Sequence, residues 1–203
     1  MIYFCENYNN SCYFYKLKSK YLINDQLKIV LVGGPGTGKT SVLNKLSNQF
    51  TCFDEISREI TTEAQQKGIE QLFLKDPILF SKLLLEKREQ QFLNAEKSNE
   101  SIIFFDRGIP DVLAYLKYSK TKHPKIFNEK CLEYRYNLIF HFSPWEEIHE
   151  TDNERYESFD QTKKIDTYLK KTYSELNYSV IDVPFGSIDE RTDYIINTID
   201  IYK

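Results

Sequence analysis

The sequence predicts a doubly wound α/β domain, in which a five-stranded parallel sheet carries helices on both faces. The first observation behind this prediction is an alternation: from residue 27 onward, short apolar runs are separated by longer segments of helical periodicity, as in βαβ units. The second observation is the character of the runs themselves. KIVLV and SIIFF are almost continuously apolar, which is typical of parallel strands buried on both sides.

The expected elements follow in order along the chain. Strands are expected at residues 27–32, 51–54, 101–105, 137–142 and 178–183. Helices are expected at residues 39–49, 57–67, 77–97, 110–118, 125–136, 158–176 and 188–201. Gly68 is a good C-cap for the second helix, and Asp76 followed by Pro77 is a typical N-terminus for the third. Ser187 and Glu190 stand at capping-box spacing before the last helix.

The chain is expected to form one domain, residues 27–203, preceded by an appendage at residues 1–26. The appendage is rich in Tyr, Phe and Asn and shows neither strand nor helix periodicity. We interpret it as a segment outside the core, and a docking arm for a partner is the alternative.

Composition narrows the class of protein. Hydrophobic residues make up 41% of the chain and the net charge is −3, with acidic and basic residues interspersed, so no electrostatic footprint for nucleic acid is expected. No apolar run approaches the roughly 18 residues that span a bilayer. The four cysteines lack zinc-ligand spacing and are expected to be idle thiols in a reducing cytoplasm.

A phosphate-binding motif lies between the first expected strand and the first expected helix. Its residues are Gly33, Gly34, Pro35, Gly36, Thr37, Gly38, Lys39 and Thr40, followed by Ser41. This run fits GxxxxGK[ST], the P-loop, in which glycines let backbone N–H groups converge on phosphate oxygens at a helix N-terminus. Lys39 is then expected to reach the β- and γ-phosphates, and the Thr40 hydroxyl to bind Mg²⁺. The sequence therefore predicts a P-loop protein that binds ATP and Mg²⁺.

Two further clusters follow strands of the expected sheet. Asp106 closes the apolar run IIFF, which predicts a carboxylate at the ligand-binding edge and a second magnesium ligand, with Arg107 beside it for the substrate or the transferred phosphoryl group. After the second strand, Glu55 and Arg58 lie on one face of a helix entrance, opposite a buried apolar stripe. They are candidates to face the phosphates, and a solvated helix face is the alternative.

The stretches GGPGTGKT, EISREI, IIFFDRGIPDVLAYL and SPWEEIHETDNERYESF together resemble the P-loop group typified by the NadR ribosylnicotinamide kinase domain, often described as ATPases of AAA type. The resemblance covers nearly the whole chain after residue 26. It implies a nucleoside- or nucleotide-kinase-like architecture with a substrate cleft and a helical lid.

The resemblance also implies roles for individual residues. Glu55 takes the place of the acid that handles the acceptor hydroxyl, and Asp106 with Arg107 resembles the DR pair of those kinases. Arg155 falls where lid arginines close on the phosphates, and the loop at residues 184–187 would border the adenine. The lid stretch carries this single arginine, fewer than many small-molecule kinases have.

Two aromatic positions have simpler expectations. His141, within an apolar run, is expected to be a hydrogen-bonded core residue rather than a ligand. Trp145 is expected to be a packed loop aromatic, with a stacking platform as the alternative.

Two functions remain open from the sequence. The first is an ATP-dependent phosphotransferase acting on a small metabolite, in which Lys39, Arg107 and Arg155 spread the γ-phosphoryl charge. The second is a nucleotide-switched binding module that regulates a protein or lipid partner. A guanine-selecting Asn/Thr-Lys-x-Asp motif is absent from the sequence, which favours ATP over GTP.

Overall fold

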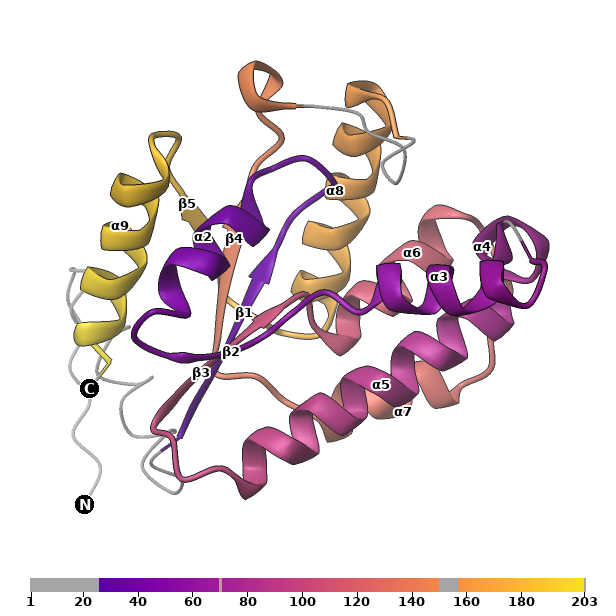
Figure 1. Ribbon diagram of the computed structural model, residues 1–203, viewed down its shortest axis with the longest axis horizontal. Helices are drawn as coiled ribbons and strands as arrows, with labels where there is room; N and C mark the ends of the chain where they lie inside the picture. The colour runs from indigo at the N-terminus through magenta and orange to yellow at the C-terminus, as the bar shows by residue number, and fades with distance from the viewer. Residues whose placement is uncertain (1–25, 70, 150–156, 203) are drawn as a thin grey trace, which may run out of the picture.

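The computed structural model describes residues 26–69, 71–149 and 157–202. Its five strands are β1 (Leu27–Val32), β2 (Thr51–Phe53), β3 (Ile102–Asp106), β4 (Leu138–Phe142) and β5 (Val180–Val183). They form one parallel sheet in the order β2-β3-β1-β4-β5 (Figure 1). The predicted fold class is confirmed.

Helices connect the strands. They are α2 (Lys39–Leu46), α3 (Ser57–Gln66), α4 (Leu72–Lys75), α5 (Pro77–Lys97), α6 (Ile109–Tyr118), α7 (Ile126–Glu133), α8 (Phe159–Glu175) and α9 (Ile188–Asp200), with a 3-10 turn, η1 (Glu146–Ile148). The bounds of α5 are as predicted, because the Asp76 side chain accepts from the N–H of Leu79 and Pro77 occupies the first turn. The elements α4 and η1 were not predicted, since each is too short for a periodic pattern.

Several predicted helices were too long at their ends. The prediction for α2 ran to Gln49, but the N–H groups of Asn48 and Gln49 bond to carbonyls three residues back, which makes a turn. Asp106, placed just after its strand by the sequence pattern, is the last residue of β3. These differences do not change which elements carry the site residues.

The sheet has helices on both faces, with a separate apolar core under each layer. Ile29 and Leu31 of β1 pack with α2 and α9, whereas Val30 and Val32 belong to the opposite core, with α3, α5, α6 and α8. Figure 1 shows α2 and α9 on one side of the sheet and α3, α5, α6 and α8 on the other. This alternation follows from the period of two along a strand. The carboxyl ends of the strands thus lie between two helical layers, where ligands bind in such folds.

The start of the core is fixed by Gln26, whose side-chain amide donates hydrogen bonds to the carbonyls of Ala95, Ser98 and Glu100. Gln26 therefore belongs with the folded domain rather than with the predicted appendage. The rest of that appendage, residues 1–25, lies outside the described residues. Over the part of the chain that is described, no helix has the length and apolar character required to cross a bilayer.

His141 of β4 is fully buried and lies between two carboxylates, as expected of a hydrogen-bonded core residue. Its Nδ1 lies 2.6 Å from Asp182 Oδ1, and its Nε2 lies 2.7 Å from Asp166 Oδ1 on α8. Lys170 Nζ also contacts Asp182 Oδ1, at 3.0 Å. This chain of polar contacts joins α8 to the sheet directly beside the P-loop.

Replacing His141 should weaken this junction. His141→Leu leaves the buried Asp166 carboxylate without its partner, which we expect to cost about 3 kcal/mol of unfolding free energy. The double variant His141→Leu/Asp166→Leu should recover much of that loss, and Lys170→Ala, at an exposed position, should cost about 0.5 kcal/mol or less. Chemical denaturation measures all three, and a double variant no more stable than the single would contradict this account.

Candidate active site

A cleft of about 1540 Å³ opens at the carboxyl edge of the sheet. The P-loop forms its floor, while α3, α4, α5 and α6 line one end and the loops after β4 and β5 line the other. Residues from Pro35 to Ser41 face the cleft. Gly33 and Gly34 lie beneath it and use their carbonyls to accept hydrogen bonds from Arg107 and Lys39.

Lys39 is buried at the centre of the loop. Its ammonium donates to the Gly34 carbonyl at 2.8 Å and to Thr37 Oγ1 at 3.2 Å. Burial and the nearby Arg107 lower the pKa of Lys39 to about 8, although Asp106 and Glu55 raise it. The negative charge of a triphosphate bound in the loop would favour the charged ammonium and raise the pKa of Lys39.

Two glycines of the loop are required by their backbone and by close neighbours. Gly36 has φ +72°, and a Cβ there would lie 2.7 Å from His149 Nδ1. Gly38 has φ +81°, and a Cβ there would lie 2.6 Å from Arg191 Nη1. Both dihedrals are in the left-handed region that only glycine adopts readily. The P-loop pattern of the sequence therefore reflects both backbone geometry and packing.

The two predicted magnesium ligands meet. Thr40 Oγ1 donates to Asp106 Oδ2 at 2.8 Å, and Asp106 Oδ1 is buried without a hydrogen-bond partner. Burial raises the pKa of Asp106, which Lys39 opposes. A hydroxyl and a carboxylate with a spare oxygen, beside a phosphate cradle, fit Mg²⁺, which binds proteins through few side chains and completes its shell with phosphates and water.

Next to this pair lies a buried cluster of four charges: Glu55, Arg88, Arg107 and Asp111. Glu55 Oε1 accepts from Arg88 Nη2 at 3.1 Å, and Glu55 Oε2 contacts Arg107 Nε. Arg107 Nη1 also lies 3.4 Å from Asp111 Oδ1. The two carboxylates balance the two guanidinium groups, so the cluster is neutral overall.

The backbone conformation of Arg107 and the hydrogen bonds to Asp111 hold this cluster in place. Arg107 has φ +74°, a strained conformation for a residue with a Cβ, and its N–H donates to the Leu31 carbonyl. Asp111 is fully buried and accepts from the Gly108 N–H at 2.9 Å and from the Tyr173 hydroxyl at 2.6 Å. Such strain persists only where surrounding contacts determine the geometry.

The electrostatics of Glu55 follow from these partners. Burial alone would raise its pKa, but Arg107 and Arg88, with the Ser57 N–H, lower it to about 2. Glu55 is therefore ionised across the physiological pH range. Its low proton affinity makes Glu55 a weak general base.

The fold and the site permit a comparison with known proteins. Residues 28–191 match the family described as an AAA domain. The chain belongs to this family. No match is found among curated protein sequences.

Solved structures of kinases share the fold of this AAA domain protein. The NadR protein in complex with NR is 19% identical with a TM-score of 0.65, over 87% of this chain and 49% of that one, so the chain spans about half of NadR. Deoxyadenosine kinase from M. mycoides with bound dATP is 14% identical, with a TM-score of 0.63 over 86% and 100% of the two chains. Thymidylate kinase from Candida albicans is 16% identical, with a TM-score of 0.60 over 88% and 94%. The resemblance read from the sequence is confirmed for family and fold.

Not every predicted residue of this AAA domain lies in the cluster. Arg58 lies on the exposed side of α3, where it lines the cleft. Arg155 lies outside the described residues, so its lid role stays a prediction.

The structure adds residues that the sequence reading missed. Arg88 on α5, Asp111 on α6 and Arg191 on α9 are all buried, at 3%, 0% and 5% exposure. Thr162 of α8 donates to the Pro35 carbonyl at 3.3 Å. The sequence held one signal of these residues: Asp111 is a charged residue within the apolar stretch IPDVLAYL, where a buried charge needs a partner.

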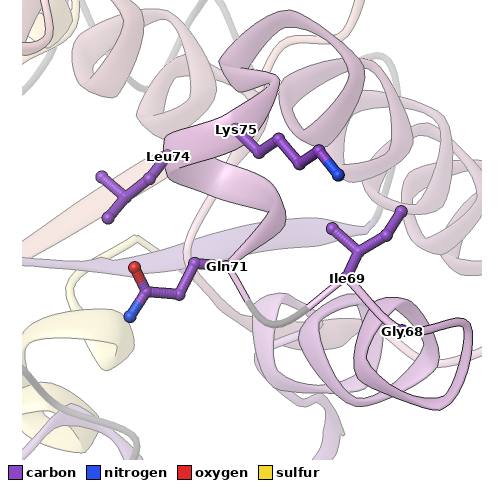
Figure 2. Close-up of a pocket in the computed structure, with 5 residues that line it drawn as sticks. All are labelled: Gly68, Ile69, Gln71, Leu74 and Lys75. Carbon is purple, nitrogen blue, oxygen red and sulfur yellow. The ribbon is translucent and has the colours of Figure 1, made fainter.

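A second, shallow depression of about 460 Å³ lies around α4, lined by Gly68, Ile69, Gln71, Leu74 and Lys75. Figure 2 shows Gln71 and Leu74 extending to one side of α4, and Ile69 and Lys75 on the other. These side chains do not converge on a common point. We therefore do not interpret the depression as a site.

The pKa of Lys39 leads to a prediction about ATP affinity. Because the triphosphate favours the charged ammonium, affinity should fall by up to tenfold per pH unit as pH rises above about 8. Lys39→Arg stays charged and should bind ATP with no such pH dependence, while Lys39→Ala should lose most binding. Calorimetric titration between pH 7.5 and 9.5 measures this, and an equal fall in Lys39→Arg would exclude Lys39 as its cause.

The metal assignment has its own test. Asp106→Asn keeps the shape of the side chain but removes the charge opposite Mg²⁺, so magnesium-dependent ATP binding should weaken far more than metal-free binding. Thr40→Ser, which keeps the hydroxyl, should retain the metal dependence. Equal weakening by Asp106→Asn with and without Mg²⁺ would make Asp106 a structural residue.

Proposed function

We propose that the chain is an ATP- and Mg²⁺-dependent phosphotransferase that moves the γ-phosphoryl group to a hydroxyl of a small metabolite. The observation that carries this proposal is the buried cluster of Glu55, Arg88, Arg107 and Asp111 beside the P-loop. Four desolvated charges beside a phosphate site are costly to bury, and perturbed charges of this kind cluster at functional sites.

The similar structures support the same class of reaction. Deoxyadenosine kinase with dATP, thymidylate kinase and NadR with NR share the fold of this chain. Their identities of 14–19% leave the acceptor of this chain open. Which acceptor binds depends on the side chains that line the site.

The reaction would form a bond between the acceptor oxygen and the γ-phosphorus, and break the bond from that phosphorus to the oxygen it shares with the β-phosphate, which leaves as part of ADP. Lys39 and Arg107 would neutralise charge on the transferred group. Mg²⁺, held by Thr40 and Asp106, would neutralise charge on the phosphate oxygens. The hydroxyl proton would pass to solvent or to the new phosphate ester, since Glu55 is a weak base.

Glu55 would orient the acceptor. Its Oε1 accepts from Arg88 and from the N–H groups of Ile56 and Ser57, whereas its Oε2 contacts Arg107. A remaining lone pair on Oε2 would hold the hydroxyl in line with the γ-phosphate. Phosphoryl transfer through a loose transition state depends on such positioning more than on base strength.

The acceptor end is suited to an uncharged molecule. Its two buried guanidinium groups are balanced by carboxylates, and the walls above them include Phe80, Leu84 and Tyr115. The balanced buried charges and the aromatic lining favour a hydroxyl compound with an apolar body.

An acceptor panel tests the proposal. We expect a subset of nucleosides and other ring-bearing alcohols to accelerate ADP release. Glu55→Gln should reduce that stimulated rate by about 10²- to 10⁴-fold while ATP affinity changes little, because the carboxylate faces the acceptor. Glu59→Gln, an exposed position on α3 four residues further along, is the matched control and should behave as wild type.

Each outcome separates the two functions. Stimulation of wild type that survives in a folded Glu55→Gln variant would keep the kinase and remove Glu55 from acceptor positioning. ATP binding without stimulation by any compound would favour a nucleotide-switched binding module instead.

A further inference from the structure

The cleft extends from the phosphates in two directions. Glu55 and Arg107 mark the acceptor end, beyond the position of the γ-phosphate. The base of a nucleotide held by the P-loop is then expected at the opposite end of the cleft. That end is lined by Asn44, Trp145, Gly186, Ser187, Ile188 and Arg191.

A pair of aromatic rings stands at this end. Trp145 follows β4 and Phe185 follows β5, and their rings stack with centroids 5.0 Å apart and planes 26° apart. Phe185 is 58% exposed. Trp145 is half-buried and lines the cleft, and Phe185 packs against it, so an aromatic surface borders the end where the base is expected.

Ser187 and Arg191 at this end bond within the protein. Ser187 donates its N–H to Glu190 Oε2 at 2.7 Å, and its hydroxyl accepts from the Glu190 N–H at 3.2 Å. Arg191 donates through Nη1 to the Thr37 carbonyl at 3.2 Å and through Nε to the Ser187 carbonyl at 3.4 Å. The exposed Asn44 amide can both donate and accept, so it does not by itself distinguish adenine from guanine.

We propose that Trp145 and Phe185 form a stacking platform that holds the base of the donor nucleotide by its face, so that purine and pyrimidine nucleoside triphosphates serve with similar affinity. Stacking is tolerant of base identity because every base has a π-face, whereas discrimination needs edge hydrogen bonds that fit one base. The inference rests on the proposed nucleotide site and extends it to the breadth of donors.

The chain contains one tryptophan, so its fluorescence reports on this ring alone. We expect ATP, GTP, CTP and UTP each to change the emission of the full chain, with dissociation constants within about tenfold of one another. Inorganic tripolyphosphate, which has no base, should bind the P-loop and raise the melting temperature while leaving the emission nearly unchanged.

Variants separate stacking from folding. Trp145→Leu should weaken all four nucleotides by about 5- to 150-fold, the range that base stacking supplies, without changing tripolyphosphate affinity. Phe185→Ala should act in the same direction, and Trp145→Phe, which keeps an aromatic face, should retain most of the affinity. Affinities for these variants are measured by thermal shift or calorimetry.

Three results would overturn the inference: a preference above about 100-fold for one base, unchanged nucleotide affinity in Trp145→Leu, or equal weakening of tripolyphosphate and nucleotides in both Trp145→Leu and Trp145→Phe. Failure of tripolyphosphate and ATP to bind wild type would instead refute the nucleotide site itself. The two failures are therefore distinguishable.

Discussion

The arrangement of the site depends on the burial of charge between Glu55, Arg88, Arg107 and Asp111. Removing these groups from water is tolerable only when each finds an opposite charge and hydrogen bonds. The partners come from the end of β2, from α5, from the end of β3 and from α6. Satisfying them therefore fixes how these elements meet, and this in turn sets the acceptor end of the cleft.

Helix α8 extends that constraint to the phosphate loop. One side of it carries three buried polar side chains: Thr162 bonds to the P-loop carbonyl of Pro35, Asp166 to His141 of the sheet, and Tyr173 to Asp111 of the cluster. The phosphate cradle and the acceptor end thus share one rigid support. A site supported in this way can hold a donor and an acceptor at a defined separation, as phosphoryl transfer requires.

The fold does not determine which molecule accepts the phosphoryl group. Kinases with different acceptors share this architecture at identities of 14–19%, so the fold by itself does not identify an acceptor for this chain. Specificity at either end must come from side chains that differ between such proteins. For this chain we propose the neutral charge cluster at one end and the Trp145–Phe185 pair at the other.

The sequence alone determined the features that depend on neighbouring residues: the P-loop, the alternation of strands and helices, the cap at Asp76, and the placement of Asp106 at a strand end. Only the tertiary structure decided that Glu55 pairs with Arg88, 33 residues away, and that Asp111 bonds to Tyr173, 62 residues away. Local periodicity places a side chain on a face of its own helix. Which charge it meets there is set by how helices pack across the sheet, and that information is spread along the whole chain.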